Sequence, residues 1–184
     1  MVTAALAQVP ELDPREIDDF YLGCAEPWGE HGSNMARVVS VLAGMDHLPG
    51  ATVNRFCSSS LQTTRMAMHA IKAGEGDVFV SGGVECVSRY ADFTGAGMSK
   101  VAWQNPRFAE ARERTERIAA ENTPWTDPRA EGLLPDVYIA MGQTAENVAT
   151  SRGVSRERQD EWGVTSQNRA QAAIEAGILA REIT

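Results

Sequence analysis

One stretch of this 184-residue chain, residues 51–74, constrains the fold more than any other. Its first residues include Thr52, Val53 and Phe56, which are β-branched or aromatic and favour a strand. A helix-forming run then continues without proline or glycine until Gly74, which is the kind of residue that ends a helix. The stretch therefore predicts a strand that is followed at once by a helix.

Cys57 lies at the junction between these two elements. Three serines follow it, Ser58, Ser59 and Ser60, and their hydroxyl oxygens are of the kind that cap a helix start. Unpaired N–H groups and the positive end of the helix dipole are concentrated there, so the thiolate form is favoured. Cys57 is therefore a candidate nucleophile. The alternative is a small buried residue that fills a tight turn, and the local sequence leaves both interpretations open.

Composition excludes several classes of partner. The hydrophobic fraction of 43% is that of a globular chain with one or two domains. The net charge of −8 argues against nucleic acid and against an anionic membrane surface as partners. Since no apolar run has transmembrane length and the first residues lack the layout of a signal peptide, we expect a soluble, cytoplasmic protein.

The three cysteines are Cys24, Cys57 and Cys86. Their odd number and wide spacing fit neither a disulfide framework nor a zinc-ligand pair. We therefore expect reduced thiols and no metal site. Away from the junction, Cys24 and Cys86 are interpreted as small buried residues.

Further segments extend the strand–helix pattern on both sides of the central stretch. Residues 17–23 and 77–81 predict strands, the second of the buried parallel type. Residues 34–43 predict an amphipathic helix. Its apolar face is expected to consist of Met35, Val38, Val39 and Leu42. Strands that alternate with helices through residue 89 predict an α/β fold with a mostly parallel sheet.

The second half of the chain has a different pattern. Helices are expected over residues 107–121, 138–152 and 156–177, and no strand pattern accompanies them. We expect residues 1–90 to form an α/β core and residues 91–184 to form a mainly helical domain that covers it.

Four sequence runs, taken in chain order, form a distinctive set. VNRFCSSSLQT surrounds Cys57, and AGEGDVFVSGGVECVSR follows it. MGQTAENVA spans Met141–Ala149, and SQNRAQAA spans Ser166–Ala173. These runs resemble the thiolases, a family of acyl-CoA acyltransferases. The resemblance implies the N-terminal core of a thiolase together with the loop domain that covers the active site and holds the CoA pantetheine arm. It also implies that the first strand of that core and its C-terminal half are missing from these residues.

Two observations near the candidate nucleophile concern glycine. Ser60 stands where the resemblance leads us to expect the glycine of a Cys-x-x-Gly motif. A serine there would be strained if the backbone needed a positive φ. Gly82 and Gly83 predict a close approach of the backbone to a ligand or to a neighbouring element.

The resemblance implies a cysteine-linked acyl-enzyme. In this chemistry the thiolate, here Cys57, attacks a 3-ketoacyl-CoA, acetyl-CoA leaves, and CoA then takes the acyl group; the reverse is a Claisen condensation. Met141 matches a family position beside the pantetheine and acyl chain, although an ordinary core methionine fits as well. Ala140 replaces a histidine common in biosynthetic thiolases, which favours the degradative class of fatty acid metabolism. CoA and acyl-CoA would be substrates, and no permanently bound cofactor is implied.

The family's remaining catalytic motifs, Gly-His-Pro, an Asn-His segment and Cys-x-Gly, do not occur in these 184 residues. His69 lies twelve residues along the helix from Cys57, roughly 18 Å away, and cannot act as its base. His31 and His47 are interpreted as surface loop residues. We therefore expect the chain alone to be incompetent in turnover. As partners we expect further copies of the chain in a homo-oligomer, or a chain that supplies the C-terminal half.

Three other interpretations remain. A non-catalytic thiolase-like subunit would bind acyl-CoA or take part in assembly. A ketoacyl-synthase relative would share the fold but fits MGQTAENVA less well. A cysteine hydrolase would need a histidine near Cys57, and the sequence places none there.

Overall fold

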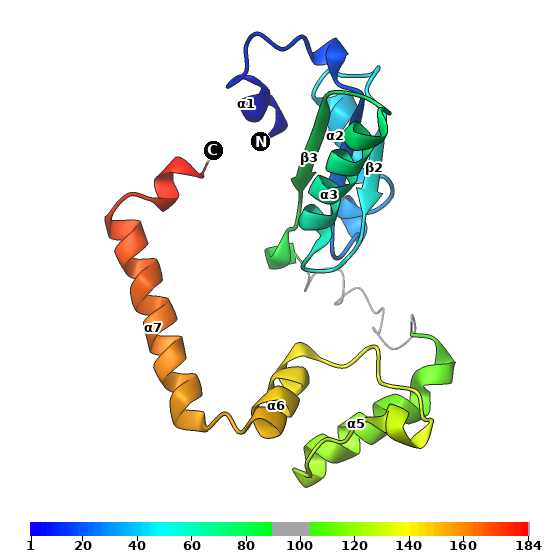
Figure 1. Ribbon diagram of the computed structural model, residues 1–184, viewed down its shortest axis with the longest axis vertical. Helices are drawn as coiled ribbons and strands as arrows, with labels where there is room; N and C mark the ends of the chain where they lie inside the picture. Colours follow the sequence, from blue (N-terminus) through cyan, green and yellow to red (C-terminus); the bar gives the residue numbers. More distant parts are fainter. Residues whose placement is uncertain (90–103, 184) are drawn as a thin grey trace. The chain divides into compact units, whose positions relative to one another are not determined.

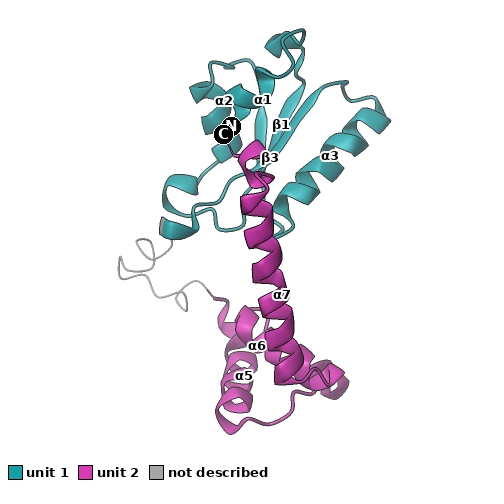
Figure 2. Cartoon of the chain, turned by 90° about the vertical axis from the view of Figure 1, so that its left-hand side faces the viewer, with its two compact units in different colours: residues 1–98 teal, residues 99–184 magenta. Residues whose placement is uncertain are grey.

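The structure is a computed structural model that describes residues 1–89 and 104–183. Contacts divide the chain into two compact units, Met1–Met98 and Ser99–Thr184 (Figures 1 and 2). The predicted domain boundary between residues 90 and 91 falls outside the described residues. Each unit is described by itself below.

The first unit is built on a parallel three-stranded sheet. Its strands are β1 (Asp19–Gly23), β2 (Gly50–Val53) and β3 (Phe79–Gly83), in the order β2-β1-β3. Helix α2 (Met35–Leu42) packs on β1 and β2, and helix α3 (Ser59–Ala73) packs on the sheet from the other side (Figure 2). The predicted parallel α/β sheet is confirmed.

The hydrophobic core lies on the α2 side of this sheet. Phe20 and Leu22 alternate along β1, so both side chains point to the same face, and Phe20 is fully buried. The buried apolar cluster consists of Ile17, Phe20, Leu22, Ala36, Met45 and Leu48. Helix α1 (Val2–Leu6) contributes Val2 and Leu6 to its edge. Burial of these side chains supplies the main driving force for folding of the unit.

The predicted apolar face of α2 is partly wrong. Val38 and Leu42 are exposed, whereas Ala36 and Ser40 are fully buried. The reason is a close approach of α2 to β2: a Cβ built on Gly50 would lie 3.0 Å from the Ala36 Cβ. At that separation a small side chain fits and a large one does not. The Ser40 hydroxyl is satisfied inside the core because it lies within hydrogen-bond distance of the Arg37 and Leu48 carbonyls.

Small and polar residues form the contact between α3 and the sheet. Thr63, Ala67 and Ala70 are the buried residues in the middle of the helix. The Thr63 hydroxyl lies 2.8 Å from the Ser60 carbonyl and 2.9 Å from the Ser81 hydroxyl, so the buried oxygen is paired. Helix α3 ends at Gly74, whose φ of +74° is the left-handed cap predicted for it.

Asp18 ties the start of β1 to the turn before β3. Its Oδ2 accepts hydrogen bonds from the backbone N–H of Asp77 at 2.8 Å and of Val78 at 3.0 Å. The bonds from Val78 and then Asp77 lower the pKa of the Asp18 carboxyl, because they stabilise the carboxylate.

Asp18 is therefore expected to make stability depend on acid. Because its folded-state pKa is lowered, its contribution is present above the unfolded pKa of about 4 and is lost as the pH falls through the folded pKa. Thermal unfolding should show that the midpoint temperature falls less between pH 7 and pH 3 for Asp18→Asn than for the unaltered chain. Identical pH profiles would contradict this role.

The described part of the second unit is helical. Its helices are α5 (Ala109–Glu121), α6 (Met141–Arg152) and α7 (Arg156–Glu175) (Figure 1). The Ser155 hydroxyl accepts from the Arg158 N–H and caps α7. Short 3-10 helices lie at Pro14–Glu16, Gly29–His31, Val87–Arg89, Pro106–Phe108, Pro128–Glu131 and Leu179–Arg181.

Among the described residues of the whole chain, no helix combines the length and the apolar character needed to cross a membrane.

Candidate functional site

Cys57 lies in a sharp turn between β2 and α3, at the carboxyl edge of the parallel sheet. The residue before it, Phe56, has a φ of +47°, in the left-handed region that non-glycine residues rarely adopt. The prediction of a strand conformation at Phe56 is wrong, since β2 ends at Val53. The turn presents the Cys57 thiol to solvent: the residue is exposed, so the alternative of a small buried turn residue is excluded.

Two side chains hold this strained turn. The buried Ser59 hydroxyl accepts from the Arg55 N–H at 2.9 Å and donates to the Phe56 carbonyl at 2.6 Å. The Asn54 side chain accepts from the Phe56 N–H at 2.8 Å and donates to the Ala25 carbonyl at 3.1 Å. Hydrogen bonds on both sides of Phe56 therefore offset the cost of its positive φ, of the order of 1–2 kcal/mol.

The three serines after Cys57 do not act as the expected caps. Ser58 occupies the N-cap position of α3 but makes no side-chain capping bond there. Ser59 instead bonds to the preceding turn. Ser60 is helical and has no positive φ, so the strain considered for a serine in place of glycine does not arise.

Glycines at the strand ends explain how α3 comes so close to the sheet. A Cβ on Gly23, at the end of β1, would lie 2.6 Å from the backbone of both Ser59 and Ser60. A Cβ on Gly83 would lie 3.0 Å from the Ser60 Cβ, whereas one on Gly82 would make only an ordinary 3.7 Å contact with Leu22. The predicted close approach is therefore confirmed for Gly83 and not for Gly82, and sequence reasoning missed Gly23.

This geometry suits covalent chemistry at the thiol. The carboxyl edge of a parallel sheet is where α/β folds bind ligands. The N-terminus of α3 adds N–H groups and a positive dipole end, which favour the negative charge that develops on an attacked carbonyl.

Comparison with known proteins decides the family. A family model described as the N-terminal domain of thiolase matches residues 1–184. The chain belongs to the thiolase family. It is 36% identical over 185 residues to a beta-ketoadipyl-CoA thiolase of Acinetobacter baylyi, which covers 99% of this chain and 43% of that protein. It is 37% identical over 184 residues to a 3-ketoacyl-CoA thiolase of Aeromonas salmonicida, covering 100% of this chain and 40% of the relative.

A solved thiolase-family structure supports the same assignment. The crystal structure of the Bacillus anthracis acetyl-CoA acetyltransferase matches with a TM-score of 0.65 and 29% sequence identity. The match covers 94% of this chain and 40% of that one. The chain thus has the fold expected for the N-terminal part of a thiolase, and it spans about two fifths of the length of the curated relatives above.

Met141, the second predicted site residue, belongs to the other unit. It is the first residue of α6 and is 76% exposed, so it is not a core methionine in the described unit. Near it, α5, α6 and the segment between them enclose an open cavity of about 300 Å³. Its lining includes Ile118, Trp125, Ile139, Thr144 and Val148. The role of Met141 toward an acyl-CoA stays a prediction.

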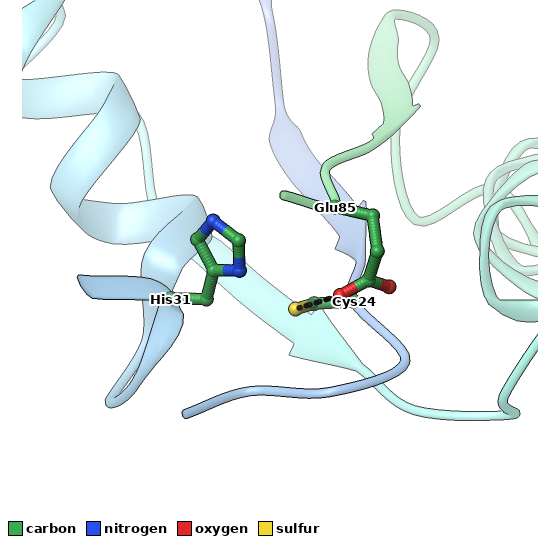
Figure 3. Close-up of side chains that lie close together, drawn as sticks. All are labelled: Cys24, His31 and Glu85. Atoms are coloured by element: carbon green, nitrogen blue, oxygen red, sulfur yellow. Dashed lines mark hydrogen bonds between the residues drawn. The ribbon is translucent and has the colours of Figure 1, made fainter. Parts of the chain in front are cut away.

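The structure corrects the interpretation of one histidine. His47 and His69 are exposed, but His31, expected on the surface, is 95% buried, with 5% of its surface exposed. The loop after β1 turns at Gly29, which has a φ of +56°, and the 3-10 helix that follows directs the imidazole inward. There it meets Cys24 and Glu85, which follow β1 and β3 (Figure 3).

Cys24 lacks the exposure to solvent that Cys57 has. It is buried, as predicted, and its Sγ lies 3.8 Å from the Glu85 Oε1. Burial, and then the negative charge of Glu85, raise the pKa of the Cys24 thiol. A raised pKa keeps the thiol protonated, so Cys24, His31 and Glu85 do not form a nucleophilic triad.

Proposed function

We propose that this chain carries the nucleophile of a thiolase-type acyl-CoA acyltransferase, with Cys57 in that role. The thiolate attacks the 3-keto carbonyl of a 3-ketoacyl-CoA, the bond between C2 and C3 breaks, and the departing carbanion takes up a proton to give acetyl-CoA. The shortened acyl group stays on Cys57 as a thioester until CoA attacks it. The observation that carries the proposal is the exposed thiol in a braced turn at the N-terminus of α3.

Two further features support an acyl-CoA substrate. The relatives are named as thiolases of 3-ketoacyl-CoA and beta-ketoadipyl-CoA. The cavity beside α6 offers an apolar lining of a size suited to part of a pantetheine arm. With Met141 exposed at the start of α6, we propose that the second unit contacts the CoA substrate. Ala140 favours the degradative class of thiolase.

Turnover requires groups that these 184 residues do not contain. No described histidine serves Cys57: the His47 Nε2 lies 3.0 Å from the Pro14 carbonyl, His69 lies exposed on α3, and His31 faces Cys24. We therefore propose that acylation is slow and that complete turnover needs the Gly-His-Pro and Cys-x-Gly motifs on another segment of chain.

The proposal is tested by the intact mass of the purified chain before and after incubation with acetyl-CoA or acetoacetyl-CoA. We expect a gain of one acetyl group, which peptide mapping places on the peptide that contains Cys57. Unchanged mass after prolonged incubation, in protein that is folded by circular dichroism, would contradict the nucleophile assignment. It would favour the second candidate, a non-catalytic thiolase-like subunit, which the lack of a histidine at Cys57 supports.

Helix α3 also carries an apolar stripe that faces solvent. Leu61, Met68 and Ile71 recur at i, i+7 and i+10, and they are 71%, 42% and 47% exposed. Apolar patches of this kind mark association surfaces. We propose that a second copy of the chain covers this stripe. Sedimentation velocity at micromolar concentration should show a dimer or larger species, and Met68→Lys should shift it toward monomer. A monodisperse monomer of the unaltered chain would contradict self-association.

A further inference from the structure

Three side chains from separate parts of the first unit converge beside the sheet, apart from the Cys57 turn. Cys24 follows β1, His31 ends the 3-10 helix Gly29–His31, and Glu85 follows β3 (Figure 3). One ligand atom from each residue lies within 4.8 Å of the other two. Figure 3 shows the imidazole and the carboxylate on either side of the Cys24 sulfur.

The His31 ring has an unsatisfied polar atom. Its Nδ1 is buried and has no hydrogen-bond partner among the described residues. A buried nitrogen without a partner costs about 1–3 kcal/mol, so such an atom in a native structure calls for an explanation. A cation at the meeting point of the three side chains would use the lone pair of this nitrogen.

We propose that Cys24, His31 and Glu85 bind one divalent zinc ion. Thiolate, imidazole and carboxylate are all zinc ligands, and three protein ligands leave a fourth tetrahedral position for water. The thiolate and the carboxylate each carry one negative charge, which together balance the charge of Zn²⁺. On binding, the Cys24 thiol releases its proton to solvent and a Zn–S bond forms, while His31 stays neutral with its proton on Nε2.

The geometry needs only a small adjustment. Ligand atoms around a tetrahedral zinc ion lie roughly 3.5 Å apart, given bonds of about 2.0–2.3 Å. The present separations of up to 4.8 Å therefore require side-chain shifts of about 1 Å. Glu85 is already positioned, because its carboxylate accepts from the Ala25 N–H at 2.8 Å and the Glu26 N–H at 3.3 Å.

A second group competes for the same histidine. Ligand atoms of Glu30, His31 and Cys86 also lie within 4.8 Å of one another. Each group contains an exposed carboxylate, Glu85 or Glu30, and the two groups share the buried His31. They differ in the cysteine: Cys24 is 1% exposed, whereas Cys86 is only partly buried. A sulfur that is better shielded from water interacts more strongly with a cation, so we assign the ion to the group that contains Cys24.

The proposed ion would act as a structural clamp and does not depend on the acyltransfer proposal. Cys24 and Glu85 are 61 residues apart, and the ion would join the ends of β1 and β3 through the loop that carries His31. Ala25, next to Cys24, accepts the bond from Asn54 that helps to hold the Cys57 turn. Zinc binding is therefore expected to stabilise the same sheet edge that presents Cys57.

Metal binding is tested on the full 184-residue chain in a Cys57→Ala background, so that the exposed thiol cannot bind the probe. Titration with Co²⁺ should give thiolate-to-cobalt charge-transfer absorption that saturates at one equivalent and is displaced by Zn²⁺. Cys24→Ser and His31→Gln should each weaken binding by about tenfold or more. Cys86→Ser and His69→Gln, as matched controls, should retain it.

A second measurement uses protein that keeps Cys24, His31 and Glu85, so its result does not depend on how the ligand variants fold. X-ray absorption at the zinc edge should show one sulfur at about 2.3 Å together with nitrogen or oxygen at about 2.0 Å. A shell without sulfur, or the absence of a charge-transfer band, would overturn the proposal. Loss of binding in Cys86→Ser with retention in Cys24→Ser would overturn the assignment of the ligands.

Discussion

Replacing Cys57 by alanine is expected to abolish acylation of the chain by acetyl-CoA. The acyl thioester needs the sulfur, and no other thiol has the same placement: Cys24 is buried and Cys86 is partly buried. Since the Cys57 side chain is exposed, the substitution should change the free energy of unfolding by less than about 0.5 kcal/mol. Loss of the adduct would then report on chemistry and not on folding.

The matched controls for this experiment are the other two cysteines. Cys86→Ala should retain the adduct in full, and so should Cys24→Ala after correction for any unfolded fraction. Intact mass and peptide mapping measure all three variants alongside the unaltered chain. An adduct that persists in Cys57→Ala, or that disappears in Cys86→Ala, would show that the acyl group resides elsewhere.

Replacing Gly23 by alanine is expected to be among the most destabilising single-methyl additions in the first unit. The added Cβ would lie 2.6 Å from backbone atoms of Ser59 and Ser60, a separation that no side-chain rotation relieves. Helix α3 must then move away from β1, which strains the bonds of Ser59 to the Cys57 turn. We expect a loss of about 3 kcal/mol or more, because overpacking against backbone lies at the upper end of such costs.

Gly82→Ala is the matched control for Gly23→Ala, since it adds the same methyl group to a neighbouring strand of the same sheet. Its Cβ would make only a 3.7 Å contact with the Leu22 side chain. Denaturant unfolding should give a change of less than about 1 kcal/mol for Gly82→Ala. Equal losses for the two variants would show that the close approach of α3 to β1 does not control stability. Because Gly23→Ala displaces α3 and the Cys57 turn, we also expect it to slow alkylation or acylation of Cys57 in protein that remains folded.

Local rules predicted much of this fold. The strand-to-helix junction at Cys57 and the glycine end of α3 at Gly74 each depend on residues a few positions apart. The parallel sheet followed from the alternation of strands and helices. The motifs around Cys57 and Met141 placed the chain among the thiolases, which the family model confirms.

Other features depart from what the residue propensities predict. Propensity favoured a strand conformation for Phe56, yet bonds from Asn54 and Ser59 hold it at positive φ. Large apolar residues were expected to face the core on α2, yet the close approach to Gly50 selects Ala36, and the buried Ser40 bonds to the Arg37 and Leu48 carbonyls. Short-range hydrogen bonds at Phe56 and tertiary packing at α2 each override a local preference that is worth less than about 1 kcal/mol per residue.

The sequence by itself determined the fold class, the family and the position of Cys57 between a strand and a helix, because these depend on short-range pattern and motif. Only the tertiary structure decided that Gly23 admits α3 to the sheet and that His31 is buried against Cys24 and Glu85. The physical reason is separation along the chain. Gly23 meets α3, and Cys24 meets Glu85 61 residues later, through close packing that no local periodicity encodes.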